Sequence, residues 1–261
     1  MKFKKSILGI IIIMVSLMTI AGLSGLNSII PQKQDVSGQP EDKIPEEQKK
    51  LPNMIKVSLI AEDGVKIAAD LYQVADLTSG WIILVHAMPN TKESWNNLAI
   101  GLQEQGIESI AIDLRGHGES GGESGNEAKG ILDVEAAAKY LVEKELASRD
   151  RISLAGASIG ANLALEYASR HRETKSAVLL SPGLNYHGIE AEPLVKKIST
   201  TVKMFFVSSK DDDNNVSEVE KLIGSAPSGT IKQIYDAAGH GTDMLEKEAG
   251  LKDLIINFIK Q

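Results

Sequence analysis

The chain has 261 residues and no cysteine; 43% of its residues are hydrophobic and 24% are charged, with a formal net charge of -7 at pH 7. These values are typical of a globular protein, and the acidic balance argues against a surface that binds nucleic acid. Without cysteine, disulfides, thiolate metal sites and a cysteine nucleophile are excluded. The five histidines show no metal-binding spacing, so we expect neither a metal nor a cofactor.

Residues 1–30 have a pattern that differs from the rest of the chain. Lys2, Lys4 and Lys5 precede a long uncharged run that starts at Ile7. The run is close to the ~20 residues that span a bilayer and has no clear A-x-A cleavage site, so it predicts a signal peptide or an uncleaved signal anchor, and we favour the anchor. Basic residues before an apolar run keep the N-terminus in the cytoplasm. We therefore expect an extracytoplasmic protein, membrane-anchored through this segment or secreted.

Residues 31–53 have the composition of a linker, with prolines at positions 31, 40, 45 and 52 among glutamine and charged residues. Such a segment cannot bury enough apolar surface to offset the entropy of the chain, so we expect it to be disordered. The folded domain then covers residues 54–261, about two hundred residues, which is enough for a single core.

The domain begins with two strand patterns, 55–61 and 65–72, joined by the turn signal Glu62-Asp63-Gly64. Strands and helices alternate after that point. The further strands are expected at 80–86, 107–112, 151–157, 176–181, 202–208 and 230–235, and the helices near 93–105, 127–147, 159–171, 216–223 and 243–260. This order predicts an α/β fold with a mostly parallel sheet and helices on both faces, which binds ligands at the carboxyl ends of its strands.

The motif Gly156-Ala157-Ser158-Ile159-Gly160 lies between an apolar strand pattern and a helical pattern. A serine on a sharp turn between strand and helix has an exposed hydroxyl, and small flanking residues let neighbouring backbones approach it. The motif alone occurs by chance, but its context predicts Ser158 as a nucleophile.

Two other polar segments follow later strands. The cluster Asp211-Asp212-Asp213 comes after the strand at 202–208, and His240 lies in a glycine-rich loop after the strand at 230–235. A histidine can take the proton of a serine hydroxyl, and a carboxylate can hold that histidine in the useful tautomer. All these groups are expected at the same edge of the sheet.

With Leu84-Val85-His86-Ala87-Met88 and the run from Asp113 to Ser120, these segments make the chain resemble the α/β-hydrolase superfamily from about residue 55 onward. The resemblance implies a serine hydrolase with the chain order serine, acid, histidine. Its spacing from the strand end favours Asp212 as the acid beside Ser158 and His240, while Asp211 and Asp213 stay open as alternatives.

The resemblance also implies an oxyanion hole made by two backbone N–H groups, those of Met88 and Ile159. Where relatives read His-Gly, this chain has Ala87 after His86, which is a departure from the family pattern in the same loop. Arg115 and His117 belong to the glycine-rich run and are expected to be structural.

A small-molecule carboxylic ester is the substrate that the resemblance implies. Only residues 183–201 separate two of the predicted strands, which leaves room for one short helix near 193–198 and predicts a shallow pocket. The resemblance implies that Tyr186, His187 and Met88 line it. A peptidase or acyltransferase with the same triad and a non-catalytic binding module at the cell surface are the alternatives. The chain contains no propeller and no large acidic cap, which favours esters over peptides.

Overall fold

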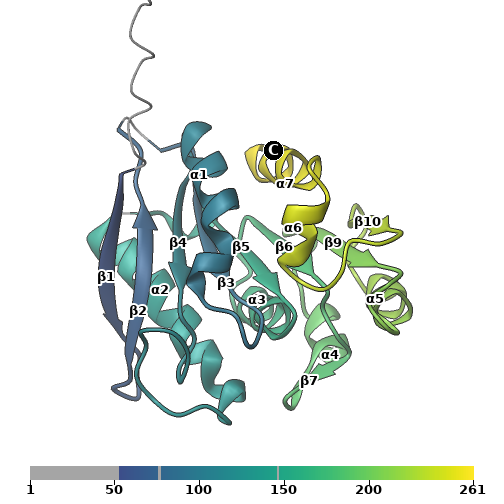
Figure 1. The fold of residues 1–261 in the computed structure, drawn as a ribbon, viewed down its shortest axis with the longest axis horizontal. Coiled ribbons are helices and arrows are strands. Elements are labelled where there is room, and N and C mark those ends of the chain that lie inside the picture. The colour runs from purple at the N-terminus through teal and green to yellow at the C-terminus, as the bar shows by residue number, and fades with distance from the viewer. Residues whose placement is uncertain (1–52, 76–77, 146) are drawn as a thin grey trace, which may run out of the picture. The chain divides into compact units, whose positions relative to one another are not determined.

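An eight-stranded sheet forms the centre of the computed structural model, which describes residues 53–75, 78–145 and 147–261 (Figure 1). The predicted signal segment 1–30 and all but the last residue of the predicted linker lie outside the described residues. The strands, in their order across the sheet, are β1 Met54–Ile60, β2 Lys66–Tyr72, β4 Glu108–Ile112, β3 Trp81–Val85, β5 Ile152–Ala157, β6 Ser176–Leu180, β9 Lys203–Ser209 and β10 Ile231–Tyr235.

Strand direction in the sheet confirms the predicted mostly parallel arrangement. The pairs β1–β2 and β2–β4 are antiparallel, and every later pair is parallel. Two reversals leave β1 running in the same direction as β4. Asn53, directly before β1, therefore lies at the edge where the parallel strands begin, and the candidate site lies at the opposite edge.

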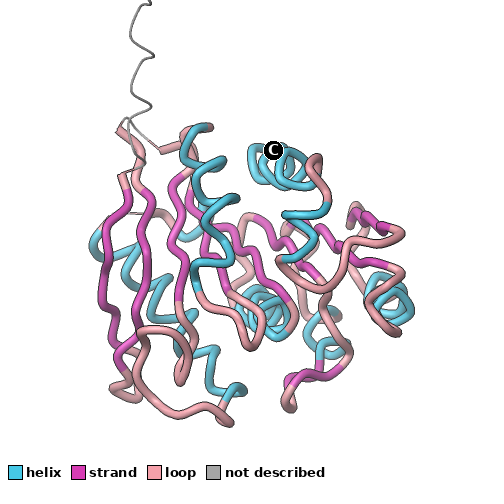
Figure 2. The backbone as a smooth tube through the Cα atoms, viewed as in Figure 1, coloured by secondary structure: helices cyan, strands magenta, loops and turns pink. Residues whose placement is uncertain are grey.

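Helices cover both faces of the sheet (Figure 2). Successive side chains of a strand point to opposite faces, so Ile83 and Val85 of β3 pack in one core, whereas Ile82 and Leu84 pack in the other. The first core is covered by α2 Gly130–Lys144, α3 Ile159–Arg170, α4 Ala191–Val195 and α5 Asn215–Ile223, and the second by α1 Asn96–Glu104, α6 Asp243–Lys247 and α7 Leu251–Lys260.

Short 3-10 helices precede longer elements: η1 Lys92–Trp95 before α1, η2 Glu127–Lys129 before α2, and η3 Arg149–Arg151 before β5. In the part of the chain that the structure describes, no helix is both long and apolar enough to cross a bilayer.

The prediction of one helix over 243–260 was wrong, because the structure has α6 and α7 with a break at Glu248–Gly250. The N–H of Glu248 still donates to the carbonyl of Met244, but the N–H of Leu251 donates to the carbonyl of Glu248. Gly250, the residue before α7, favours a break because glycine stabilises a helix poorly. A second difference is the unpredicted hairpin of β7 Asn185–Tyr186 and β8 Ile189–Glu190, which precedes α4.

A buried charge network joins the loops that follow β3 and β4. Lys92, with a side chain only 1% exposed, donates from Nζ to Asp113 Oδ2 at 2.9 Å and to Glu119 Oε2 at 3.0 Å. The Asp113 carboxylate also accepts the backbone N–H groups of Lys92 and Glu119. These bonds connect the two loops at the carboxyl edge of the sheet.

Replacing Lys92 should therefore destabilise the fold. Lys92→Met keeps most of the side-chain length but leaves the Asp113 carboxylate buried without its cation, which should lower the free energy of unfolding by about 3 kcal/mol in urea denaturation. Lys56→Met is the matched control, since it removes an exposed partner of Glu119 and should change stability little. Equal losses in the two variants would contradict this role of the buried pair.

Candidate active site

The turn between β5 and α3 gives Ser158 an uncommon backbone conformation, with φ 53° and ψ -121°. A non-glycine residue with positive φ is strained, and such strain persists only where the surroundings hold it. Here the N–H of Ser158 donates to the carbonyl of Leu180 at 2.8 Å, and the carbonyl of Ser158 accepts the N–H of Ala161. The turn thus places the serine at the carboxyl end of a central strand and at the start of a helix.

The two glycines of the motif allow this turn to pack tightly. A Cβ on Gly156 would lie 2.1 Å from the carbonyl oxygen of Gly160, and a Cβ on Gly160 would lie 2.2 Å from that of Val85 in β3. Neither position can hold a larger side chain without moving backbone. The sequence argument that small residues let neighbouring backbones approach therefore has a direct structural counterpart.

His240 and Asp212 are brought together from separate loops. Nδ1 of His240 lies 2.8 Å from both carboxylate oxygens of Asp212. A hydrogen bond at Nδ1 to a carboxylate requires the proton there, which leaves Nε2 as the basic nitrogen. His240 is half-exposed, whereas Asp212 is mostly buried.

The loop of His240 also lies against the serine turn. The N–H of Gly241 donates to the buried Ser181 hydroxyl at 3.0 Å, and a Cβ on Gly241 would lie 3.4 Å from Cβ of Ala157, the residue before Ser158. The histidine loop and the serine turn are therefore in contact at the same edge of the sheet.

Hydrogen bonding to Asp212 is the main cause that raises the pKa of His240 above its ordinary value of 6.5; burial opposes the rise, and the charges of Asp212, Asp243 and Asp213 add to it. Because the folded-state pKa is raised, the pair contributes stability that is fully present below the unfolded value. That contribution is lost as the pH rises through the folded value.

The three neighbouring aspartates occupy different places. Asp212 alone of the three hydrogen-bonds to His240 among the described residues. Asp211 accepts the N–H of Gly239 and the hydroxyl of Ser209, and these two bonds are the main causes that lower its pKa. Asp213 has a positive φ of 36° in the turn. Of the three acids left open by the sequence, Asp212 is the one in position to orient His240.

The two expected oxyanion donors lie at the ends of neighbouring strands. Met88 follows β3, Ile159 is the first residue of α3, and within the described chain neither backbone N–H has a hydrogen-bond acceptor. Both groups are therefore free to bind a ligand oxygen. No cluster of three or more metal-ligating side chains occurs in the described ranges.

His86 holds the loop that carries Met88. Its ring is fully buried, Nε2 accepts the N–H of Leu114 at 2.9 Å, and Nδ1 lies 2.7 Å from the carbonyl of Ala87. These partners require the neutral tautomer with the proton on Nδ1, and burial is the main cause that lowers the pKa of His86. The histidine is thus a structural link between the loops after β3 and β4.

Tyr186 lies on the hairpin that the sequence did not predict, and its hydroxyl donates to the carbonyl of Ser181 at 3.4 Å, beside the serine turn. Burial raises the pKa of its phenol, the charges of Asp212 and Glu218 add to the rise, and hydrogen bonding with Ser158 and Asn215 opposes it. The ring packs on Gly183, where a Cβ would lie 2.5 Å from the ring.

Two asparagines fix the loop that carries this hairpin. Asn162 of α3 bonds to the backbone of Gly183 and Ile189, and Asn215 of α5 donates to the carbonyl of Pro182. Sequence reasoning missed both asparagines. Their only signal was that each lies within four residues of a predicted catalytic residue.

Other polar residues considered in the sequence have structural partners. Arg115 is buried and pairs with Asp133 and Asp63, and His117 lies 3.0 Å from the carbonyl of Arg115. His171, directly after α3, stacks on Tyr167 and lies 2.8 Å from Glu135 of α2. His187 lies 3.5 Å from Glu127.

The raised pKa of His240 can be measured by NMR titration of its ring protons. We expect a value above 6.5 in the wild type and a clear decrease in Asp212→Asn, because the amide keeps the shape but removes the main cause of the shift. Asp213→Asn is the matched control, since Asp213 acts on His240 only through its charge and contributes less than Asp212 or Asp243. A larger decrease in Asp213→Asn than in Asp212→Asn would contradict the pairing.

Comparison with known proteins places this site in a family. A family model described as serine aminopeptidase, S33, matches residues 78–226, more than half of the chain. A search of curated proteins gives no significant match. The matched range includes Ser158, Asp212, Met88 and Ile159 and ends before His240.

Solved structures are similar over most of the chain. An esterase from Pyrococcus furiosus has a TM-score of 0.69 at 21% identity, covering 80% of this chain and 91% of its own. The α/β hydrolase GrgF from Penicillium sp. sh18 has a TM-score of 0.70 at 15% identity, covering 79% of this chain and 98% of its own. An esterase from Exiguobacterium antarcticum has a TM-score of 0.66 at 14% identity, covering 79% of this chain and 100% of its own. At these identities the likeness shows the fold alone. With the family match, it makes the chain a member of the serine aminopeptidase S33 family within the α/β-hydrolase superfamily.

Proposed function

We propose that this protein is a serine hydrolase that cleaves carboxylic esters through Ser158, His240 and Asp212. The observation that carries the proposal is the hydrogen bond between Nδ1 of His240 and Asp212, in a loop that contacts the strained serine turn. A histidine oriented in this way has Nε2 free to accept a proton.

In the reaction, Nε2 of His240 takes the hydroxyl proton as Oγ of Ser158 attacks the carbonyl carbon of the ester. The carbonyl electron pair moves onto its oxygen, and the N–H groups of Met88 and Ile159 bind the resulting oxyanion. When the tetrahedral intermediate collapses, the leaving alkoxide takes the proton from His240. Water then attacks the acyl-enzyme with the same base, which releases the acid and restores Ser158.

The acyl pocket should be small, because Tyr186 lies close to the nucleophile on a short and well-anchored hairpin. Its phenol donates to the carbonyl of Ser181 at 3.4 Å, beside the serine turn, and the hairpin backbone is held by Asn162. A bulky ring beside the nucleophile favours short acyl chains.

A peptidase is the second candidate, and the description of the matching family model supports it. A peptide substrate with a free amine needs a carboxylate to bind it. The two carboxylates whose charges act on Tyr186 already have partners, since Asp212 bonds to His240 and Glu218 accepts the N–H of Leu184 at 3.2 Å. Neither of these two carboxylates is therefore free to bind a substrate amine, which supports an ester.

Activity tests the proposal directly. The wild type should react with a fluorophosphonate probe and hydrolyse short-chain p-nitrophenyl esters faster than aminoacyl p-nitroanilides, while Ser158→Ala and His240→Ala should lower kcat at least about a thousandfold. His171→Ala is the control that should keep activity, since His171 bonds to Glu135 away from the turn. A folded wild type that neither reacts with the probe nor turns over would favour the non-catalytic binding module.

Activity measured on p-nitrophenyl esters of increasing acyl length tests whether Tyr186 limits the size of the acyl pocket. Tyr186→Ala should increase the relative activity on longer acyl chains, and Tyr186→Phe, which keeps the ring, should retain the short-chain preference. An unchanged chain-length profile in Tyr186→Ala would show that this ring does not limit the pocket.

We further propose that the hydrolase domain is extracytoplasmic and attached to the membrane by residues 1–30. The support is the sequence pattern of basic residues before a long uncharged run. In intact cells, the full chain should sediment with membranes and be digested by added protease, whereas a cytoplasmic marker should be protected. Release into the medium would indicate a cleaved signal peptide, and protection from protease would contradict export.

A further inference from the structure

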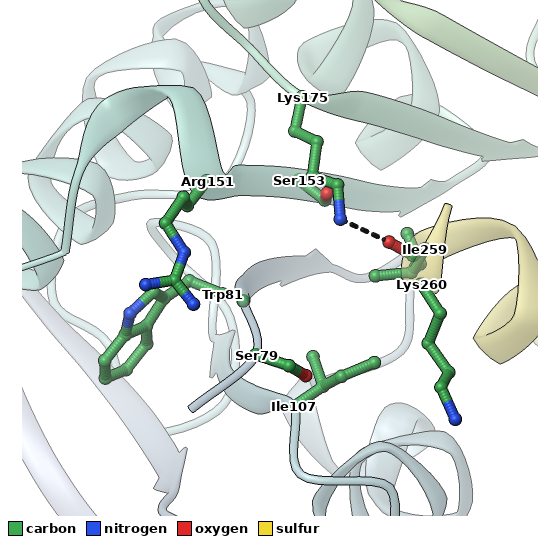
Figure 3. Close-up of a pocket in the computed structure, with 9 residues that line it drawn as sticks. Ser79, Trp81, Ile107, Arg151, Ser153, Lys175, Ile259 and Lys260 are labelled. Atoms are coloured by element: carbon green, nitrogen blue, oxygen red, sulfur yellow. Dashed lines mark hydrogen bonds between the residues drawn. The ribbon is translucent and has the colours of Figure 1, made fainter. Parts of the chain in front are cut away.

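A cavity of about 90 Å³ lies at the edge of the sheet opposite Ser158, where the parallel strands begin (Figure 3). Trp81 and Ile107 form apolar walls, and Arg151, Ser153 and Lys175 supply polar groups. The volume corresponds to about three molecules of liquid water, at roughly 30 Å³ each. A single phosphate-sized group fits this space.

Basic residues precede three neighbouring strands at this edge. Arg151 comes directly before β5, Lys175 directly before β6, and Lys203 is the first residue of β9. These strands are adjacent in the sheet, so the three cations form a row. Lys260, at the end of α7, adds a fourth cation to the lining of the cavity.

Within the described chain, the two cations that line the cavity beside the strands have no acidic partner. Among the residues that the structure describes, neither Arg151 nor Lys175 has a carboxylate within 4.0 Å. Each bonds to a backbone carbonyl instead, Lys175 to Ile259 at 2.7 Å and Arg151 to Thr78 at 2.6 Å. The more deeply buried cation Lys92, in contrast, contacts three carboxylates.

The nearest acids along the chain are already engaged. The Asp150 carboxylate accepts the hydroxyl of Ser148, and Glu173 lies 3.5 Å from His171. Burial is the main cause that lowers the pKa of Lys175, and the positive charges of Lys203 and Arg151 lower it further. The cavity therefore holds positive charge that a bound anion would balance.

A hydroxyl completes the lining. Ser153 is fully buried and its Oγ accepts the hydroxyl proton of Ser176 at 2.8 Å. That bond leaves the hydroxyl proton of Ser153 available for a ligand in the cavity. A site with a guanidinium, an ammonium and a hydroxyl donor matches the acceptor oxygens of a phosphate.

We propose that this cavity binds a phosphate group between Arg151, Lys175 and the hydroxyl of Ser153. The phosphate can come from free inorganic phosphate or from the phosphodiester of an anionic lipid headgroup, whose negative charge is not neutralised by a headgroup cation. Asn53 lies at this same edge and accepts hydrogen bonds from Gln73 and Gln103, so the chain enters the domain on the side of the cavity. A headgroup bound there would leave Ser158 facing away from the lipid.

Thermal unfolding of the full chain in neutral detergent tests the site with two probes. Inorganic phosphate is titrated against chloride at equal ionic strength, and soluble dihexanoylphosphatidylglycerol against dihexanoylphosphatidylcholine. Phosphate should raise the Tm more than chloride does, or the anionic lipid should raise it more than the zwitterionic lipid does. A shift with phosphate indicates the free anion, and a shift with the anionic lipid alone indicates a headgroup.

Variants separate this site from general charge effects. Lys175→Met and Arg151→Gln should each weaken binding of the active probe about tenfold, because each removes a charged hydrogen-bond donor. Arg151 is exposed, so its variant should fold even if Lys175→Met does not. Lys129→Met, which removes an exposed cation before α2 at the opposite edge, should bind as the wild type does.

Two outcomes would overturn the proposal. One is equal affinity of Arg151→Gln and the wild type for the active probe. The other is a Tm that phosphate raises no more than chloride and that the anionic lipid raises no more than phosphatidylcholine.

Discussion

Close backbone packing between β3 and the turn after β5 is the constraint on which the site depends. Gly160 lies so near the carbonyl of Val85 that no side chain fits between them, and Gly156 lies equally near Gly160. This contact holds α3 against the sheet and keeps Ser158 in its strained conformation. It also places the N–H of Ile159 beside the loop that carries Met88, so one contact sets both the nucleophile and the oxyanion donors.

The remaining groups of the site depend on that turn through a few polar links. His86 connects the loop of Met88 to the loop after β4, and the buried Lys92 and Asp113 connect the same two loops by charge. Ser181 binds the loop of His240 from the end of β6. Each link is buried. Removing one partner of such a link would therefore lower the free energy of unfolding by several times what an exposed ion pair contributes.

Charged side chains have different partners at the two edges of the sheet. At the carboxyl edge, Lys92 and Arg115 are each paired with carboxylates, and the half-exposed His240 faces Asp212. At the other edge, Arg151 and Lys175 face a cavity, and their partners among the described residues are backbone carbonyls. A protein with an overall acidic balance thus keeps a local concentration of unbalanced positive charge, far from the groups proposed for ester hydrolysis.

The local pattern of the sequence was sufficient to predict the fold class. Continuous apolar runs such as Trp81–Val85 indicate strands buried on both faces, and their alternation with helical patterns requires a parallel sheet. The G-x-S-x-G motif likewise depends on neighbours in the chain, so Ser158 could be identified as a candidate directly. The break between α6 and α7 was missed, because the periodic pattern continues through Gly250.

Only the tertiary structure decided which groups meet. Asp211, Asp212 and Asp213 are the same residue type, and the turn that directs Asp212 to His240 is held by a local bond from Ser209 and by the N–H of Gly239 in another loop. Tyr186 lies beside the serine turn on a hairpin whose loop is held by Asn162 and Asn215 from other elements. The row of cations exists because β5, β6 and β9 are neighbours in the sheet. Spacing along a chain determines local conformation, whereas contacts between segments depend on the order and register of the strands, which no single segment encodes.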